Sequence, residues 1–282
     1  MNIPKLRKIE TKKKYHNKYV LSDDYSWVDQ PNILEVLRSP EKILPEVKKY
    51  IEENNDLTEE YFKDTKKLQK KIFSEIKSKI KLEDTSLKFK DKKFYYWTKT
   101  EKDGNYNKRL RQLIDNTKPE EIYFDGDIEK AKHGSKYFGL GSVSVSHCDN
   151  FLAYSLDLQG SEYYTIYLRD LNTKKDFKDT ILNTSGNITW SLDSKSFFYS
   201  QLDKFHRPRK IFRHYIGSPI EKDELIYEEK DETFTCSISL TADEKFFVIS
   251  TSDHITTEEY FFASNSNSIK LKLFKKRVSD VR

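Results

Sequence analysis

The hydrophobic positions of the chain change their spacing about a third of the way along it. Residues 46–81 contain no Gly or Pro, and Pro45 suits the first turn of a helix, where its missing N–H costs nothing. Apolar residues here recur at steps of three to four positions or multiples of them, which places them on one helical face with Lys and Glu on the other. This spacing predicts two consecutive helices, or one long helix, within residues 31–81; the apolar positions are Leu57, Tyr61, Leu68, Ile72, Ile76 and Ile80.

From Leu87 onward the spacing no longer fits a helix. Aromatic residues crowd into residues 89–97, and Asp103-Gly104 separates them from a second run that begins at Tyr106. An Asp-Gly pair between two such runs is typical of a β-hairpin. Helical spacing does not return, so this part of the chain is expected to be all-β; its further strand-like runs are Phe151–Leu156, Tyr163–Leu168, Phe197–Gln201, Ile211–Tyr215, Phe246–Thr251 and Glu259–Ala263.

Three segments of the second part repeat one another: residues 146–155, 191–200 and 241–250. Each begins with a hydroxyl residue, has an aspartate two or three places later, then an apolar pair, and closes on a serine. A period of about 40–50 residues with about four strands in each unit is typical of a β-propeller. The Ser-x-Asp turn would join two strands of a blade, with the aspartate capping the backbone of the turn. A β-sandwich with coincidental turns is the alternative.

Composition excludes several classes of protein. Only 36% of the 282 residues are apolar, but aromatic residues reach 14%, which argues for a buried core rather than disorder. No run approaches the 18 or so apolar residues of a membrane-spanning helix, and the N-terminus lacks the apolar segment of a secretory signal. Cys148 and Cys236 are too few for a disulfide framework or a four-ligand zinc site. We therefore expect a cytoplasmic protein with reduced thiols, no metal and no cofactor.

The charge is mildly basic. The formal net charge is +5, from 51 basic and 46 acidic residues, and Lys greatly outnumbers Arg. Nucleic-acid readers rely on Arg and on one clustered basic face, whereas acids and bases alternate along most of this chain. The dense run Lys5–Lys18 is best interpreted as a solvated part of an extended, basic segment, residues 1–30. Contact with an acidic partner is one alternative, and RNA binding by this arm together with residues 275–277 is a weaker one; we expect no nucleic-acid and no membrane partner.

The side chains that often carry catalysis or metal binding do not form a convincing site. His147 and Cys148 are adjacent in sequence, so in a strand or turn their side chains point away from each other and a nucleophile–base pair is not expected. His206 and His214 flank one predicted strand, but a metal site would need a third ligand that the sequence does not identify. Packing is the expected role of these histidines. Core packing, rather than a stacking platform for a ligand, is likewise expected of Trp27, Trp97 and Trp190.

Several stretches, in order along almost the whole chain, resemble the N-terminal part of the prolyl oligopeptidase family of serine peptidases, and within it most resemble oligopeptidase B (protease II). They are Asp23-Asp24-Tyr25-Ser26-Trp27, the helical region Pro45–Ile80 with Glu52-Glu53-Asn54, the first hairpin, Gly160-Ser161-Glu162-Tyr163-Tyr164, Arg169-Asp170-Leu171, Arg207–His214 and Leu225–Phe234.

The resemblance implies a fold. Family members have an α/β-hydrolase catalytic domain, a seven-bladed propeller that caps it, and an N-terminal extension that wraps the hydrolase. For this chain it implies an α+β protein in which residues 1–82 form the extension, a basic arm plus helices. Residues 83–282 would form an incomplete β-propeller of about four of the seven blades. The catalytic α/β-hydrolase domain is expected to be absent. Arg207, Arg209 and Arg213 would form a small basic cluster at a solvated strand edge, or else line the propeller cavity or the interface with the hydrolase.

The resemblance also tells us which active site to look for. Acyl transfer in this family needs Gly-x-Ser-x-Gly on a sharp strand–turn–helix elbow, with Asp and His later in the chain. Ser142 in Gly139-Leu140-Gly141-Ser142, Ser135 after Gly134, and Ser161 in Gly160-Ser161-Glu162 lack glycines at the right offsets. We therefore expect no catalytic, cofactor-binding or metal-binding residue in this chain.

These observations lead to one functional hypothesis and one alternative. The first is an N-terminal fragment of an oligopeptidase B-like serine endopeptidase, a truncated gene product or half of a split enzyme. The complete enzyme would cleave short peptides after Lys or Arg, with the propeller gating access, and this chain alone would be inactive. Its partner would be a separate C-terminal hydrolase polypeptide, with short basic peptides as substrates once the two are joined. The alternative is a non-enzymatic partial propeller that binds a protein partner through its uncovered blade face and strand edge.

Overall fold

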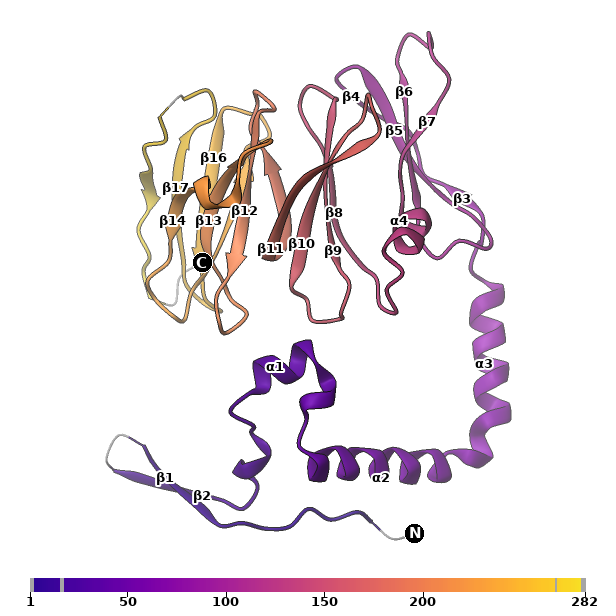
Figure 1. Ribbon diagram of the computed structural model, residues 1–282, viewed down its shortest axis with the longest axis vertical. Helices are drawn as coiled ribbons and strands as arrows, with labels where there is room; N and C mark the ends of the chain where they lie inside the picture. Colours follow the sequence, from indigo (N-terminus) through magenta and orange to yellow (C-terminus); the bar gives the residue numbers. More distant parts are fainter. Residues whose placement is uncertain (1–2, 16–17, 267, 280–282) are drawn as a thin grey trace. The chain divides into compact units, whose positions relative to one another are not determined.

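The computed structural model describes residues 3–15, 18–266 and 268–279 (Figure 1). The chain divides between Glu83 and Asp84 into two compact units. No helix formed by the described residues is both long enough and apolar enough to cross a membrane.

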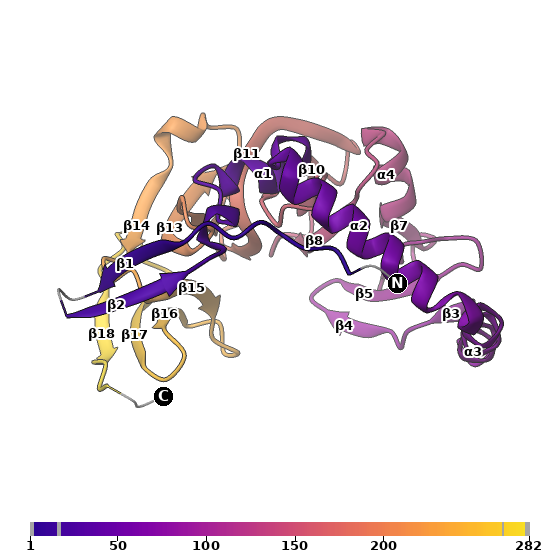
Figure 2. The same ribbon diagram turned by 90° about the horizontal axis from the view of Figure 1, so that it is seen from below.

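The first unit is a hairpin followed by helices. Strands β1 (Thr11–Tyr15) and β2 (Tyr19–Asp23) pair antiparallel (Figure 2). Helix α1 (Ile33–Arg38) precedes α2 (Pro45–Tyr61) and α3 (Lys66–Ser78), which meet at a corner in Figure 1. The spacing therefore predicted the helical region correctly: residues 45–78 form two consecutive helices rather than one long helix, and the short helix α1 precedes them. A tight turn at residues 63–65 separates α2 from α3. In this turn the Thr65 hydroxyl donates a hydrogen bond to the Phe62 carbonyl (2.7 Å).

This first unit has almost no core. Among its described residues only Gln30 and Val47 are buried. The Gln30 side chain organises the chain around it, because its carbonyl accepts from the Leu44 N–H (2.6 Å) while its amide donates to Asn32 and to the Lys42 carbonyl. The apolar face of α3 is exposed along its length.

The second unit is built almost entirely from antiparallel strands, which confirms the strand-rich prediction. One sheet contains β3 (Asp84–Thr85), β4 (Phe89–Asp91), β5 (Phe94–Thr100), β6 (Lys108–Leu113) and β7 (Glu121–Asp125). A seven-stranded sheet contains β8 (Gly139–Val145), β9 (Phe151–Asp157), β10 (Tyr164–Asp170), β11 (Lys175–Trp190), β12 (Ser196–Leu202), β13 (Pro208–Tyr215) and β14 (Glu224–Glu228). A four-stranded sheet contains β15 (Thr235–Leu240), β16 (Phe246–Ser252), β17 (Thr257–Ala263) and β18 (Lys272–Lys275).

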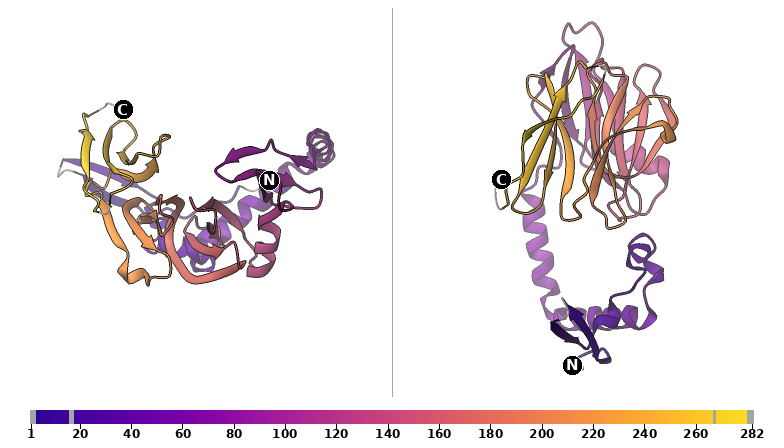
Figure 3. Two further views of the ribbon diagram at one scale, coloured as in Figure 1. Left: turned by 90° about the horizontal axis from the view of Figure 1, so that it is seen from above. Right: turned by 90° about the vertical axis from the view of Figure 1, so that its left-hand side faces the viewer.

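The seven-stranded sheet consists of two four-stranded groups that share strand β11. Residues 175–184 of this strand pair with β10, and residues 184–190 pair with β12. The strand changes course at Asn183 and Gly186, whose φ angles are 58° and 84°. The second unit thus contains four consecutive groups: β3–β7, β8 to the first half of β11, the second half of β11 to β14, and β15–β18. They follow one another side by side in chain order (Figure 3, left).

Hydrophobic clusters lie between consecutive groups. Phe124 of the first group packs with Leu152 and Tyr154 of the second. Ile166 of the second group packs with Phe197 of the third, and Phe198 of the third packs with Phe247 of the fourth. Each group therefore buries its faces against its neighbours in the chain, as the blades of a propeller do. No sheet formed by the described residues closes on itself.

The three sequence repeats form equivalent turns, which join β8 to β9, β11 to β12, and β15 to β16. In each turn the N–H of the first residue bonds to the carbonyl of the residue five places later, at 2.8–3.0 Å. The fourth residue of each turn has a positive φ, between 57° and 64°; these residues are Asp149, Ser194 and Glu244. The three repeats therefore occupy equivalent structural positions, because each forms the hairpin that begins a group.

Two of the three turns are capped as predicted. The hydroxyls of Ser191 and Thr241 donate to the aspartates two places later (2.6 and 2.7 Å), and each aspartate also accepts a backbone N–H two places further on. The first turn differs, because Cys148 occupies the position of the capping aspartate. Its Sγ lies 3.4 Å from the Ser146 hydroxyl. The expectation of a capping aspartate is thus wrong for this repeat, whose Asp149 stands one place later.

The expectation that helical structure does not return after Leu87 is also wrong. Helix α4 (Gly126–His133) lies between the first and second groups. It has little apolar periodicity and is held by its ends. The Asp125 carboxylate accepts the N–H groups of Asp127 and Ile128 (3.0 and 3.2 Å), and Gly134 ends the helix in the left-handed conformation with φ 61°.

Candidate functional site

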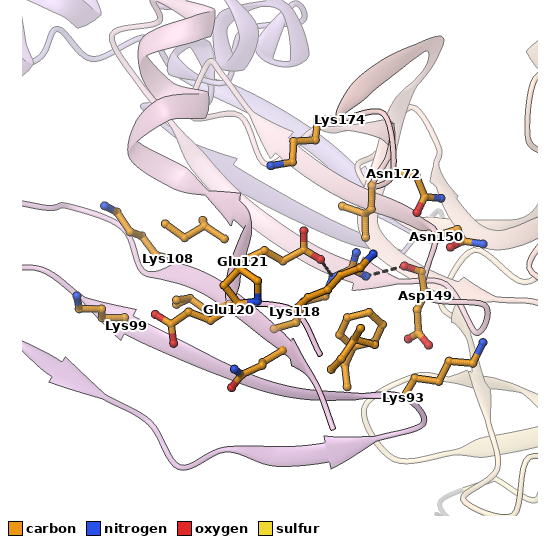
Figure 4. Close-up of a pocket in the computed structure, with 18 of the residues that line it drawn as sticks. Lys93, Lys99, Lys108, Lys118, Glu120, Glu121, Asp149, Asn150, Asn172 and Lys174 are labelled. Carbon is orange, nitrogen blue, oxygen red and sulfur yellow. Dashed lines mark hydrogen bonds and ion pairs between the residues drawn. The ribbon is translucent and has the colours of Figure 1, made fainter. Parts of the chain in front are cut away.

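A pocket of about 860 Å³ lies between the first and second groups, at the end of the strands where several of their turns meet (Figure 4). Residues of β5 and β6 line one side. Glu121 and Ile122 of β7, Glu101 after β5, and the turns that follow β4, β6, β8 and β10 supply the rest. Because turn residues from two groups meet here, side chains far apart in sequence share one hollow.

Arg111 forms the polar floor of this pocket. Its side chain is only 4% exposed. Its Nε donates to Glu121 Oε1 (2.6 Å) and its Nη1 donates to the Asp149 carbonyl (2.5 Å), as the dashed lines in Figure 4 show. The guanidinium carbon lies 4.4 Å from the centre of the Phe94 ring. Arg111 therefore fastens the first group to the turn between β8 and β9 of the second.

Tyr96 adds a second bond between the same groups. Its hydroxyl donates to Asp149 Oδ1 (2.9 Å), and both residues are buried. Burial, followed by the hydrogen bond and the charge of Asp149, raises the pKa of the Tyr96 hydroxyl well above its usual range. The hydroxyl thus stays a proton donor at neutral pH, and the Asp149 carboxylate is already occupied.

The rim of the pocket is rich in lysine. Lys108 contacts Glu101 (2.7 Å) and Asp125 (3.6 Å), and the hydrogen bond with Lys108 lowers the pKa of the Glu101 carboxyl. The ammonium groups of Lys93, Lys118 and Lys174 make no ion pair or hydrogen bond with the described residues. The pocket is therefore a hollow with a buried, paired arginine beneath it and unpaired cations around it.

His147 and Cys148 do not form a nucleophile–base pair. His147 Nδ1 lies 2.6 Å from Lys92 Nζ and 3.7 Å from Glu244 Oε1. Burial and the charge of Lys92 lower the pKa of the imidazole, which is therefore neutral at pH 7. Burial raises the pKa of the Cys148 thiol, but hydrogen bonds with Ser146 and Ser194 outweigh it, and the net shift is downward.

His206, which precedes β13, and His214, which lies within this strand, have separate surroundings. His206 Nε2 lies 3.1 Å from the Ser161 carbonyl oxygen, and its ring meets Tyr163 edge to face. His214 is fully buried, with Nδ1 2.8 Å from Asp223 Oδ1 and Nε2 3.6 Å from Asp179. Within the part of the chain that the structure describes, no three His, Cys, Asp or Glu side chains are grouped as metal ligands.

The tryptophans have structural contacts. Trp97 and Trp190 are each 4% exposed, and the Trp190 indole donates to the Ser144 carbonyl (3.1 Å). Trp27 is half-buried, and its indole donates to the Arg7 carbonyl (3.2 Å). None of the three presents a free aromatic face at the pocket.

The arginines at β13 do not form a solvated basic cluster, so this expectation is wrong. Arg209 donates to the Glu229 carbonyl from both Nε (3.2 Å) and Nη2 (2.8 Å), which ties β13 to the segment after β14. Arg213 donates to the Ser196 hydroxyl (2.8 Å). Only Arg207 is exposed. Strand β13 also lies inside its sheet, between β12 and β14, so it does not offer the solvated strand edge that the sequence suggested.

Arg277 belongs to the basic residues 275–277, but in the structure its neighbours are acidic. Its guanidinium contacts Glu229 (2.8 Å) and Glu258 (2.9 Å), two nearly buried carboxylates, and lies 3.9 Å from the centre of the Phe234 ring. The charge of Arg277 is therefore used within the fold.

Comparison with known proteins identifies the family. The sequence profile described as "Prolyl oligopeptidase, N-terminal beta-propeller domain" matches residues 4–280. The chain belongs to this family. The resemblance seen in the sequence is thereby confirmed, and so is the expectation of a propeller fold.

Relatives within the prolyl oligopeptidase family are much longer than this chain. Protease 2 of Moraxella lacunata is 26% identical over 285 residues, which cover 98% of this chain and 39% of the relative. Dipeptidyl aminopeptidase BI of Pseudoxanthomonas mexicana is 26% identical over 251 residues, covering 84% of this chain and 34% of the relative. Among solved structures, oligopeptidase B from Trypanosoma brucei with bound antipain has a TM-score of 0.85 at 23% identity, covering 100% of this chain and 40% of that protein. Oligopeptidase B from Leishmania major has a TM-score of 0.86 at 22% identity, with the same coverage.

The serines considered as a nucleophile for a peptidase of this family lie in other structural contexts. Ser142 is inside β8, Ser135 follows α4 and donates to the Leu158 carbonyl (2.6 Å), and Ser161 is in the loop between β9 and β10. None stands on a turn from a strand into a helix. Gly141 is needed for packing, since a Cβ there would lie 2.4 Å from the Ser155 hydroxyl.

Proposed function

We propose that this chain is the N-terminal part of an oligopeptidase B-like serine peptidase. The match of residues 4–280 to the N-terminal propeller domain, over 39% of the length of Protease 2, carries this proposal. The catalytic serine, aspartate and histidine would come from a hydrolase domain outside residues 1–282. Joined to it, the chain would help to cleave short peptides after Lys or Arg; alone, it would be inactive.

The exposed face of α3 supports a covering role for the first unit, which we assign to residues 1–82 as an extension that wraps the hydrolase. Leu68, Ile72 and Ile76 are 56%, 47% and 57% exposed. Because they lie on one face of the helix, they form a continuous apolar stripe. Burying such a stripe against the hydrolase would stabilise both partners by the hydrophobic effect.

The four strand groups support a gating role for residues 83–282. Each group packs against the next, and we assign each to one blade, four of the seven that a complete ring would have. A ring of blades around a central channel admits short, flexible peptides and excludes folded proteins by size. The remaining blades, like the hydrolase, would come from polypeptide beyond this chain.

Reconstitution tests the proposal. The purified chain is mixed with a separately made polypeptide that carries the remaining blades and the hydrolase domain of Moraxella lacunata Protease 2, and cleavage of a fluorogenic peptide ending in arginine is measured. We expect no cleavage by the chain alone, and restored cleavage in the mixture. The triple variant Leu68→Ser, Ile72→Ser, Ile76→Ser should lose the recovery, whereas the variant Lys67→Ser, Lys70→Ser, Lys77→Ser on the opposite face should keep it. Cleavage that is restored equally by the triple variant of the α3 stripe would contradict the covering role. If no mixture restores cleavage, the proposed enzymatic function is contradicted.

A non-enzymatic interaction module is the second candidate, and exposed apolar residues on the first and last groups favour it. Leu87 and Phe89 of the first group are 92% and 61% exposed, and Phe274 of the last group is 71% exposed. Exposed apolar surface of this kind marks protein–protein contacts. Light scattering after size exclusion decides between the two: defined oligomers that dissociate in the Phe274→Ser variant would support a module, and a stable monomer would count against it.

A further inference from the structure

The pocket between the first two groups holds three unpaired cations. Lys93 lies in the β4–β5 turn, Lys118 in the β6–β7 loop and Lys174 in the β10–β11 turn, and all three side chains are exposed. Most acids of the pocket are already occupied. Glu101 contacts Lys108 (2.7 Å), Glu121 binds Arg111 (2.6 Å), and Asp149 accepts from Tyr96 (2.9 Å). Of the acidic residues that line the pocket, only Glu120 has a side chain that makes no hydrogen bond or ion pair with the described residues.

The walls and floor between these cations are partly apolar. The apolar residues that line the hollow include Leu110, Leu113, Pro119 and Leu171. The hollow has room for a side chain of a ligand as well as for its backbone, at about 860 Å³. A ligand that suits this pocket therefore combines several negative charges with one apolar group.

We propose that this pocket docks an acidic peptide segment, whose carboxylates meet Lys93, Lys118 and Lys174 while one apolar side chain rests on the floor. The partner is a protein or peptide with clustered Asp and Glu around a Leu or a similar residue. The proposal goes beyond the peptidase function described above and does not depend on it, because the pocket lies wholly within the described second unit.

A peptide fits better than other anions. Figure 4 shows Lys93 and Lys174 on different sides of the hollow, so a single phosphate would meet only one of them. Single-stranded nucleic acids bind through aromatic platforms on which bases stack. The aromatic residue that lines this pocket is Phe94, and the Arg111 guanidinium already covers its face at 4.4 Å. The floor thus offers an apolar surface but no stacking site.

Binding is tested on the full chain by fluorescence anisotropy. The probe is a short labelled peptide in which glutamates flank one leucine, with a second peptide in which lysines replace the glutamates. We expect the acidic peptide to bind, the basic one not to bind, and the affinity to fall with added salt because the charges are exposed. The variant Lys93→Gln, Lys118→Gln, Lys174→Gln should weaken binding on the order of tenfold, since three exposed ion pairs are lost. Glu120→Gln should tighten it.

A matched variant separates the pocket from net charge. Lys136, Lys178 and Lys270 are exposed lysines of the same unit that lie outside the pocket and make no ion pair with the described residues. Replacing them with glutamine removes the same charge and should leave binding unchanged. The proposal is overturned by an equal loss in both triple variants, by undiminished binding when serine replaces the peptide's leucine, by displacement with millimolar inorganic phosphate, or by tighter binding of a single-stranded RNA.

Discussion

At the scale of single residues, two glycines with similar positive φ angles allow the effect of steric contact to be distinguished from that of backbone strain. Gly186 and Gly217 have φ angles of 84° and 77°, in the region that L-residues avoid. A Cβ on Gly186 would lie 2.9 Å from the Tyr164 ring and 3.1 Å from the Ser155 hydroxyl, whereas one on Gly217 meets nothing within 4 Å. We expect Gly217→Ala to lower the free energy of unfolding by about 1 kcal/mol and Gly186→Ala by about 3 kcal/mol. Urea denaturation measures both, and equal losses would show that packing at the bend of β11 is loose.

The two cysteines should differ sharply in reactivity. Burial raises the pKa of the Cys236 thiol to about 12, whereas the pKa of the half-buried Cys148 is lowered by its hydrogen bonds with Ser146 and Ser194. Because the thiolate is the reactive form, a thiol reagent at pH 8 should label one cysteine quickly and the second only after denaturation. Cys148→Ser should abolish the fast phase, while a fast phase that survives this change would contradict the assignment.

The raised pKa of Cys236 also gives a pH dependence with a definite sign. The unfolded chain releases this proton near the ordinary value of 9.0, and the folded chain releases it only near 12. The contribution to stability is therefore complete below pH 9 and is lost as the pH rises toward 12. Urea denaturation at pH 8 and pH 10.5 should show a smaller loss of stability in Cys236→Ala than in the unchanged protein. An equal loss would assign the alkaline sensitivity to other groups.

At the scale of elements, helix α4 depends on its cap rather than on an apolar face. The Asp125 carboxylate accepts two N–H groups of the first turn, at 3.0 and 3.2 Å. Asp125→Ala should therefore lower the free energy of unfolding by about 1 kcal/mol and speed proteolysis within residues 126–133. Asp125→Asn keeps an acceptor and should retain most of the stability. If Asp125→Asn also lowers the free energy of unfolding strongly, the ion pair of Asp125 with Lys108, rather than the cap, stabilises this region.

The sequence predicted the elements that are stabilised by an apolar face and missed α4, which is stabilised by specific polar contacts. The helices α2 and α3 and the strands β9, β10 and β16 carry their signal in the spacing of apolar residues, so periodicity found them. Helix α4 has no such stripe; it needs the Asp125 cap and the contact of Asp127 with the backbone of Asn105 at 3.1 Å, which is 22 positions away. Such contacts exist only once the chain has folded.

The pocket was hidden from sequence reasoning for the same reason. Its floor depends on Arg111 reaching the Asp149 carbonyl and on Tyr96 reaching the Asp149 carboxylate, which are 38 and 53 positions apart in the chain. A clue did exist in the first repeat, where Cys148 replaces the capping aspartate and Asp149 falls one place late. That irregularity frees the Asp149 carboxylate to accept from the first group.

At the scale of the whole molecule, burial is distributed very unevenly between the two units. In the second unit, Leu152, Phe197 and Ile249 are fully buried between neighbouring groups, so the loss of one contact affects two groups at once. In the first unit only Gln30 and Val47 of the described residues are buried. The second unit should therefore carry nearly all of the cooperative stability, and the helices of the first should behave like isolated helices, which are marginal in water.

Two leucines test this division, because they differ in burial but undergo the same substitution. Leu152 is 0% exposed and Leu68 is 56% exposed. We expect Leu152→Ala to lower the free energy of unfolding by about 3 kcal/mol, through lost burial and a cavity between groups, and Leu68→Ala to change it by less than about 0.5 kcal/mol. Hydrogen exchange on the unchanged chain should show the α3 amides exchanging much faster than those of β9. Protection of α3 equal to that of β9 would contradict the division, because it would mean that the apolar stripe of the helix is already covered in the isolated chain.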